Sequence, residues 1–228
     1  MKYEKINRRI EHLKVLISNW ALFAVIFASL FIWPFFGNQE IKEFVFNLFI
    51  SSVLILSVFA VSGEKSTKTI IHFGITLVAL WVTRYVDMPL MNGLLRIMVI
   101  IYFLTTVFRF IILVSERKEV DNYVIIEAIN GYLLLGIAFS LLITFSLIYF
   151  PTAFNFTIPK DGSMPYDPIY YSFVTLSTLG YGDKLPLEDP AKAISLLITL
   201  SGQFYLVTVM AFIVGKMLAN KSENKEEA

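Results

Sequence analysis

Long runs of apolar residues, separated by short polar segments, dominate the chain. A helix needs about 20 apolar residues to cross the hydrocarbon core of a bilayer, so this pattern predicts an all-α membrane protein with six transmembrane helices. A signal peptide is the alternative interpretation of the first run, but the run is long for such a segment and no cleavage site of small residues follows it. The predicted spans are 15–36, 44–62, 69–83, 94–114, 124–150 and 191–218.

Composition agrees with a membrane protein and excludes several classes of function. Of the 228 residues, 57% are hydrophobic and 16% are charged, and the net charge is +1. Without a strongly basic balance, we expect no nucleic-acid partner. The absence of cysteine excludes disulfides and thiolate metal sites. Because no catalytic motif is present, we expect neither enzymatic activity nor a cofactor.

The positions of Lys and Arg predict the orientation in the membrane. Cationic residues gather on the cytoplasmic side of membrane proteins. We therefore expect a multi-pass protein of the plasma membrane with both termini cytoplasmic. The cation-rich segments that lead to this prediction are 1–14, 63–68, 115–121 and 216–228.

The connection between the fifth and sixth spans, residues 151–190, is unusually long. Asp167 and Pro168 predict the start of a helix within it, with Asp167 as the N-cap. A helix of about eleven residues is roughly 16 Å long, half the hydrocarbon thickness. Such a helix cannot span the bilayer. It can only enter and return, where protein or water shields the returning backbone.

The returning segment lies in the sequence TLSTLGYGD at 175–183. Successive carbonyls point to one side when alternate residues adopt left-handed dihedral angles, which glycine does without steric cost. Gly180 and Gly182 have this spacing. Four such segments around one axis would form rings of carbonyl oxygens that replace the water shell of a potassium ion. The candidate ligands, called the filter segment below, are Thr178, Leu179, Gly180, Tyr181 and Gly182.

The sequence TLGYGD also resembles the selectivity filter of the potassium-channel family, T-V-G-Y-G followed by an acid. The outer helix, the aromatic pore helix and the inner helix with Gly202 resemble that family's pore module. The resemblance implies a homotetramer in the lipid bilayer, with K+ ions bound in the filter. It divides the chain into a cytoplasmic segment 1–14, a four-helix domain 15–115 similar in layout to a voltage sensor, a pore module 116–218 and a cytoplasmic tail 219–228.

The filter region departs from the family pattern at two positions. Leu179 replaces the commoner Val, but its side chain is expected to pack away from the ions. Val174 stands where some bacterial relatives have a glutamate that contacts the acid after the filter. Asp183 therefore needs another partner, for which Tyr170 is the candidate donor. Alternatively, Asp183 attracts cations at the mouth of the pore.

The inner helix contains candidates for a hinge and a gate. Gly202 resembles the hinge glycine of the family, although a small residue there also suits close helix packing. Leu206, Met210 and Val214 recur on one face of the helix. By resemblance this face lines the pore as a hydrophobic gate. Contact with lipid is the alternative.

The fourth span is poor in charge. Voltage-sensing relatives carry an arginine at every third position of this span, whereas here it contains only Arg96 and Arg109. At about 2.3 kcal/mol per charge per 100 mV, one or two charges do not produce steep gating. Because Glu127 lies at a similar depth to Arg109, we hypothesise an ion pair between them. In the alternative, Glu127 reaches water along its own stem.

These observations predict a potassium-selective channel that is not strongly voltage-gated. Three alternatives stay open. A potassium uptake transporter would resemble the pore module, but such relatives carry four degenerate copies of it in one chain. A poorly selective cation channel would lack the preference for potassium over sodium. A regulatory subunit would have an inert filter.

Overall fold

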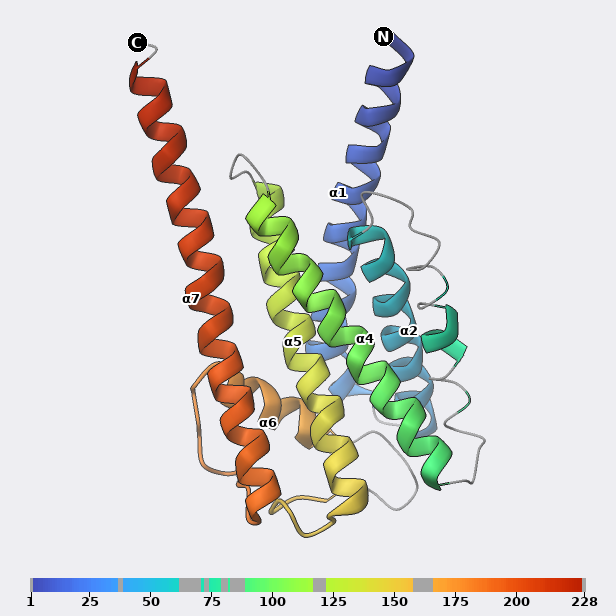
Figure 1. Cartoon of the computed structure of the whole chain (residues 1–228). Helices are drawn as coiled ribbons and strands as arrows, with labels where there is room; N and C mark the ends of the chain where they lie inside the picture. The colour runs from blue at the N-terminus through green and yellow to red at the C-terminus, as the bar shows by residue number, and fades with distance from the viewer. Residues whose placement is uncertain are drawn as a thin grey trace.

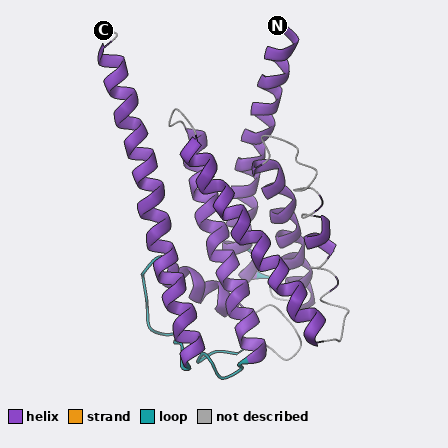
Figure 2. Cartoon of the chain, viewed as in Figure 1, coloured by secondary structure: helices purple, strands orange, loops and turns teal. Residues whose placement is uncertain are grey.

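The computed structural model describes residues 2–36, 39–61, 71, 74–78, 82, 89–116, 122–157 and 166–226. Regular structure in these residues is helical, apart from an isolated β-bridge between Phe154 and Pro186 (Figure 2). The elements are α1 (Lys2–Phe31), the 3-10 helix η1 (Trp33–Phe35), α2 (Gln39–Val61), α4 (Pro89–Glu116), α5 (Asn122–Tyr149), α6 (Tyr166–Leu176) and α7 (Asp189–Glu226).

Four of the described helices are long and apolar enough to cross a membrane, as expected for an all-α membrane protein. The predicted second span corresponds to α2, whose apolar part, Leu48–Val61, is shorter than a full span. Most of the predicted third span lies outside the described residues, so the total of six stays a prediction. The four candidate spans are Val15–Phe35, Gly93–Glu116, Tyr123–Tyr149 and Asp189–Leu218.

Helix α5 is the central element of the bundle and contacts α1, α4, α6 and α7. The short helix α6 lies between α5 and α7, toward the end of the bundle opposite to both termini (Figure 1). The fully buried side chains of Phe103 and Phe110 on α4, and of Leu134 and Ile143 on α5, form part of a continuous apolar core. This packing makes α5 the support on which the short helix rests.

Polar side chains join the helices inside the apolar bundle. Asn130 of α5 donates from Nδ2 to the backbone carbonyl of Asn19 on α1 at 2.9 Å, and the hydroxyls of Ser57 on α2 and Tyr102 on α4 are 2.9 Å apart. Interhelical hydrogen bonds of this kind contribute to helix association in lipid, where the hydrophobic effect cannot distinguish a neighbouring helix from a lipid tail. The first bond joins α5 to α1, and the second joins α2 to α4.

The position of Glu127 decides between a buried side chain and one that reaches water. Glu127 is fully buried inside the helix bundle, so it does not reach water along its own stem. Arg109 on α4 is exposed. The ion pair between the two side chains stays a prediction.

Candidate functional site

Helix α6 has the predicted length of eleven residues. It begins at Tyr166, however, so Asp167 is the second helical residue rather than the N-cap. A carboxylate in the first turn is still favoured by the helix dipole, and Pro168 is tolerated there because the first turn needs no backbone N–H donor. The Asp167 carboxylate instead accepts a bond from Nζ of Lys184 at 2.8 Å. The predicted capping role is therefore wrong.

Contacts on two sides fix α6 between its neighbours. Toward α5, the Ser172 hydroxyl donates to the Gly136 carbonyl at 2.7 Å. A Cβ on Gly136 would lie 2.4 Å from the ring of Phe173, so only glycine permits this approach. Toward α7, the hydroxyls of Tyr171 and Ser195 are 2.6 Å apart. These contacts set the position of the chain that leaves the C-terminal end of α6.

The backbone of the filter segment has an alternating conformation. Thr178, Gly180 and Gly182 have φ values of 59°, 56° and 81°, whereas Leu179 and Tyr181 between them are not left-handed. The left-handed conformation expected at both glycines is therefore present, and Thr178 extends the alternation by one step. The N–H groups of Leu179 and Gly180 donate to the Val174 carbonyl of α6 at 3.0 and 3.2 Å. The backbone N–H groups of these two residues therefore point toward α6.

Thr178 is the most unusual residue of this segment. A β-branched side chain at positive φ is an outlier whose strain costs on the order of 1–3 kcal/mol. Its hydroxyl donates to the Ser177 carbonyl at 2.6 Å. The segment is also open on one side, with Leu179 55% and Tyr181 67% exposed in the single chain. Strain and exposure in the same short segment are typical of a functional site.

Tyr170, the candidate donor to Asp183, lies within the influence of that carboxylate, and both roles weighed for Asp183 stay predictions. The ring of Tyr170 stacks on Tyr181 with the centroids 6.5 Å apart. Desolvation, a hydrogen bond to Asp183 and the negative charge of Asp183 raise the pKa of the Tyr170 phenol. The phenol therefore stays protonated and able to donate. Val174, where relatives carry a glutamate, contributes its backbone carbonyl and is half-buried.

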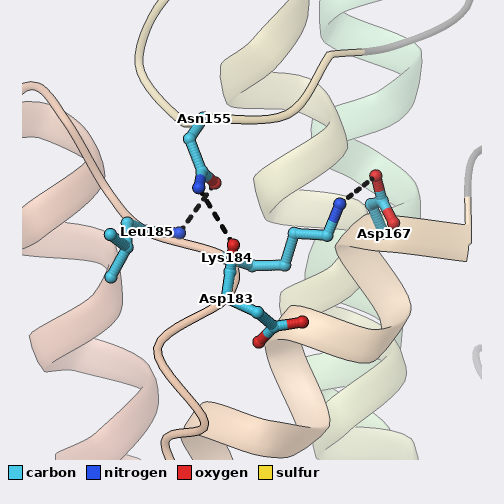
Figure 3. Close-up of polar contacts among 5 residues, drawn as sticks. All are labelled: Asn155, Asp167, Asp183, Lys184 and Leu185. Atoms are coloured by element: carbon cyan, nitrogen blue, oxygen red, sulfur yellow. Dashed lines mark hydrogen bonds and ion pairs between the residues drawn. The ribbon is translucent and has the colours of Figure 1, made fainter.

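A second set of contacts holds the chain just beyond the filter segment (Figure 3). Nδ2 of Asn155 donates to the Asp183 carbonyl at 3.0 Å, and Oδ1 of the same side chain accepts from the Leu185 N–H at 2.8 Å. Lys184, between these two residues, forms the ion pair with Asp167 described above. The exit of the filter segment is therefore attached both to the loop that follows α5 and to the start of α6.

Gly202 is buried against the C-terminal end of α6. A Cβ at this position would lie 2.4 Å from the Leu176 carbonyl oxygen and 2.9 Å from the Leu176 side chain. This close approach supports the packing interpretation of Gly202, while its role as a hinge stays a prediction. The gate candidates Leu206, Met210 and Val214 are all exposed in the single chain. Their exposure is compatible with a pore lining and with contact to lipid.

Sequence reasoning missed the contacts that position the filter segment from outside. Asn155 and Asp183 are 28 residues apart, and no periodic pattern links positions so distant in an irregular loop. Gly136 and Ser195 lie inside long apolar helices, where nothing in the sequence separates them from other small residues. The one available signal was the opposite charge of Asp167 and Lys184, which both border the filter region.

Comparison with known proteins is consistent with this geometry. Residues 137–219, which run from the middle of α5 through α6 and the filter segment into α7, match the ion channel family model. The C-terminal part of the chain is therefore similar to an ion-channel domain. Over 115 residues the chain is 28% identical to the voltage-gated potassium channel Kch of Escherichia coli (strain K12), which is 49% of this chain and 26% of that protein. No solved structure matches the chain.

Proposed function

We propose that the protein conducts potassium ions passively through a filter formed by four copies of residues 178–182. The observation that carries this proposal is the alternation of left-handed residues at Thr178, Gly180 and Gly182, directly after a helix too short to span a bilayer. With the amides of Leu179 and Gly180 bonded toward α6, the carbonyl oxygens are left for the open side of the segment. Rings of such oxygens can replace the hydration shell of a potassium ion.

A single chain supplies only one side of such a ring, so the proposal requires a homotetramer. The exposed filter segment and the exposed apolar residues of α7 are the surfaces that other copies and lipid would cover. The C-terminal end of α6 carries the negative end of the helix dipole. Four of these ends would stabilise a cation below the filter. Light scattering of the purified protein in detergent measures the number of chains.

The named relative supports potassium as the ion. The ligands would be neutral backbone oxygens, so the proposed filter needs no cofactor and no ionised side chain. Both termini lie at the same end of the bundle (Figure 1), which supports placing both on the cytoplasmic side. In a bacterial or other plasma membrane, the filter segment would then lie toward the outer surface.

Rubidium flux into liposomes containing the purified protein tests the function. We expect uptake driven by an ion gradient alone. In planar-bilayer recordings, we expect a reversal potential that shifts when sodium replaces potassium. Gly180→Ala should abolish the uptake, because a side chain at φ 56° strains the proposed filter. Gly74→Ala is the matched control, since a Cβ there meets no atom within 4 Å.

Each other outcome identifies a different function. Uptake that requires a coupling ion would identify a transporter. A reversal potential indifferent to the exchange of potassium for sodium would identify a poorly selective pore. A wild-type protein without flux would be an inert subunit. Any of these results would overturn the proposed potassium-selective channel.

A further inference from the structure

The outer loop that follows α5 is bonded to the chain that leaves the filter segment, and this contact has a specific chemistry. Asn155 makes three hydrogen bonds to residues 183–185. Two of them involve the side-chain amide, which donates to the Asp183 carbonyl at 3.0 Å and accepts from the Leu185 N–H at 2.8 Å. The third joins the Asn155 N–H to the Leu185 carbonyl at 3.0 Å. Asparagine is suited to this role because its side chain carries both a donor and an acceptor.

The geometry shows which part of the chain these bonds control (Figure 3). The Asp183 carbonyl belongs to the residue directly after Gly182, whose φ of 81° ends the left-handed alternation. A hydrogen bond to that carbonyl fixes the orientation of the next peptide plane. The carbonyl that is held lies one residue beyond Gly182, the residue with the fewest steric limits on its backbone.

A second attachment acts on the same three residues from the other side. Lys184 pairs with Asp167 in the first turn of α6 at 2.8 Å, with side chains 28% and 39% exposed. Its ammonium group also lies 5.5 Å from the centre of the Phe156 ring, beside Asn155 in the outer loop. Partial burial and the aromatic contact make this ion pair stronger than a fully exposed one.

We propose that Asn155 is a positioning residue for ion binding, which holds the exit of the filter segment in its alternating conformation through Asp183 and Leu185. The ion pair of Lys184 and Asp167 supports the same segment. This inference rests on the proposed function, because its consequence is tighter and more selective binding of potassium at residues 178–182. It assigns a role to the outer loop, outside the filter segment itself.

The contact also bears on another interpretation of Asn155. Residues 155–157 read Asn-Phe-Thr, which fits the acceptor triplet for N-glycosylation. The atom that would carry the glycan is Nδ2, which already donates to the Asp183 carbonyl. A glycan would replace one of the two Nδ2 hydrogens and leave a single donor for this bond.

Three variants of the full-length protein test the proposal. Asn155→Asp keeps the size and the acceptor but loses the donor to Asp183, and Asn155→Ala loses both side-chain bonds. Thr157→Ala is the matched control, because it removes the glycosylation triplet and leaves Asn155 intact. The measurements are potassium binding by titration calorimetry in detergent and the potassium-to-sodium permeability ratio in planar bilayers.

We expect Asn155→Asp to weaken potassium binding about fivefold, as for the loss of one hydrogen bond, and Asn155→Ala to weaken it further. Both should lower the permeability ratio, while Thr157→Ala should match the wild type. If the wild type conducts and the Asn155 variants bind potassium as tightly as Thr157→Ala, the inference is overturned. Loss of the folded tetramer in Asn155→Asp would also overturn it, since the role would then be in folding. A wild type that neither binds nor conducts potassium would instead overturn the proposed function.

Discussion

At the scale of single residues, a glycine permits a very close approach between α7 and α6. Gly202 of α7 lies so near the end of α6 that a methyl group there would meet the Leu176 carbonyl oxygen at 2.4 Å. That atom belongs to the backbone, so it cannot yield by a rotamer change. The filter segment begins two residues later. A shift of Leu176 would therefore move the chain that carries the proposed ligands.

Gly202→Ala should destabilise the protein although alanine is the better helix former. Alanine gains up to about 1 kcal/mol of helix propensity, whereas overpacking a tight contact costs about 1–3 kcal/mol. We therefore expect a lower melting temperature in detergent and weaker potassium binding. The matched control is Gly215→Ala in the same helix, where a Cβ meets nothing within 4 Å. It should melt at or slightly above the wild-type temperature.

The same pair of variants separates packing from hinging at Gly202. If the residue acts only as a hinge, Gly202→Ala should melt like Gly215→Ala and change only the opening probability in bilayer recordings. Equal melting temperatures would thus contradict the packing interpretation. A fall confined to Gly202→Ala would support it.

How far a residue could be predicted depended on whether its role is local. The left-handed glycines at 180 and 182 were predictable, because glycine alone adopts that conformation without cost. Thr178 was not predicted as left-handed, since a β-branched residue rarely occurs there, and only the surrounding structure imposes it. The role of Asn155 could not be predicted, because its partners lie 28 and 30 residues away in another loop.

At the scale of elements, α7 is attached to α4 as well as to α5 and α6. Nζ of Lys216 donates to the carbonyls of Val114 and Ser115, at 2.5 and 2.8 Å. These carbonyls lie in the last turn of α4, where they have no partner within the helix and the dipole favours a cation. The contact joins α4, the helix that contains Arg96 and Arg109, to the C-terminal half of α7.

Lys216→Met should loosen this attachment. Methionine keeps an unbranched stem of similar length but loses the charge and both hydrogen bonds. We expect a loss of about 1 kcal/mol in unfolding free energy, measured as a shift of the denaturation midpoint in mild detergent. Lys192→Met is the matched control at the other end of α7, where the pair with Asp189 is exposed and contributes little. If both variants unfold alike, α4 is not held through Lys216.

Helices could be predicted where a long apolar run, or the spacing between helix-start and turn residues, fixed their length. The half-length of α6 followed from the distance between Asp167 and the glycines, although the helix begins at Tyr166, two residues before the expected first helical residue. The long apolar runs of α1, α4, α5 and α7 were also recognised. The arrangement of these helices was not, because nearly every neighbouring residue is apolar and hydrophobic periodicity then carries no information about which face packs inside.

At the scale of the whole molecule, the two arginines of α4 bear on how the proposed channel would respond to voltage. Arg96 and Arg109 are thirteen residues apart, or roughly 20 Å along the helix. They lie near opposite ends of the candidate span Gly93–Glu116. A movement that carries one of them through the membrane field would take the other out into water. Helix α4 can therefore contribute one moving charge at most.

We accordingly expect a shallow dependence of conductance on voltage in planar bilayers with equal potassium on both sides. One charge moving through the full field contributes about 2.3 kcal/mol per 100 mV, whereas steep gating uses three to four in each subunit. Arg96→Gln and Arg109→Gln should each leave the slope of the conductance–voltage curve unchanged. The wild type recorded at two salt concentrations is the control, because surface charge shifts the curve along the voltage axis without changing its slope.

A steep curve that becomes shallow in Arg109→Gln would contradict this expectation, since it would show that α4 moves its arginine through the field. A steep curve that neither substitution changes would place the moving charge elsewhere in the chain. A shallow curve in all three proteins would mean that the contact of Lys216 with α4 stabilises the fold but does not transmit a voltage-driven movement to α7. The stimulus that opens the pore would then have to act on the inner helix or on the filter itself.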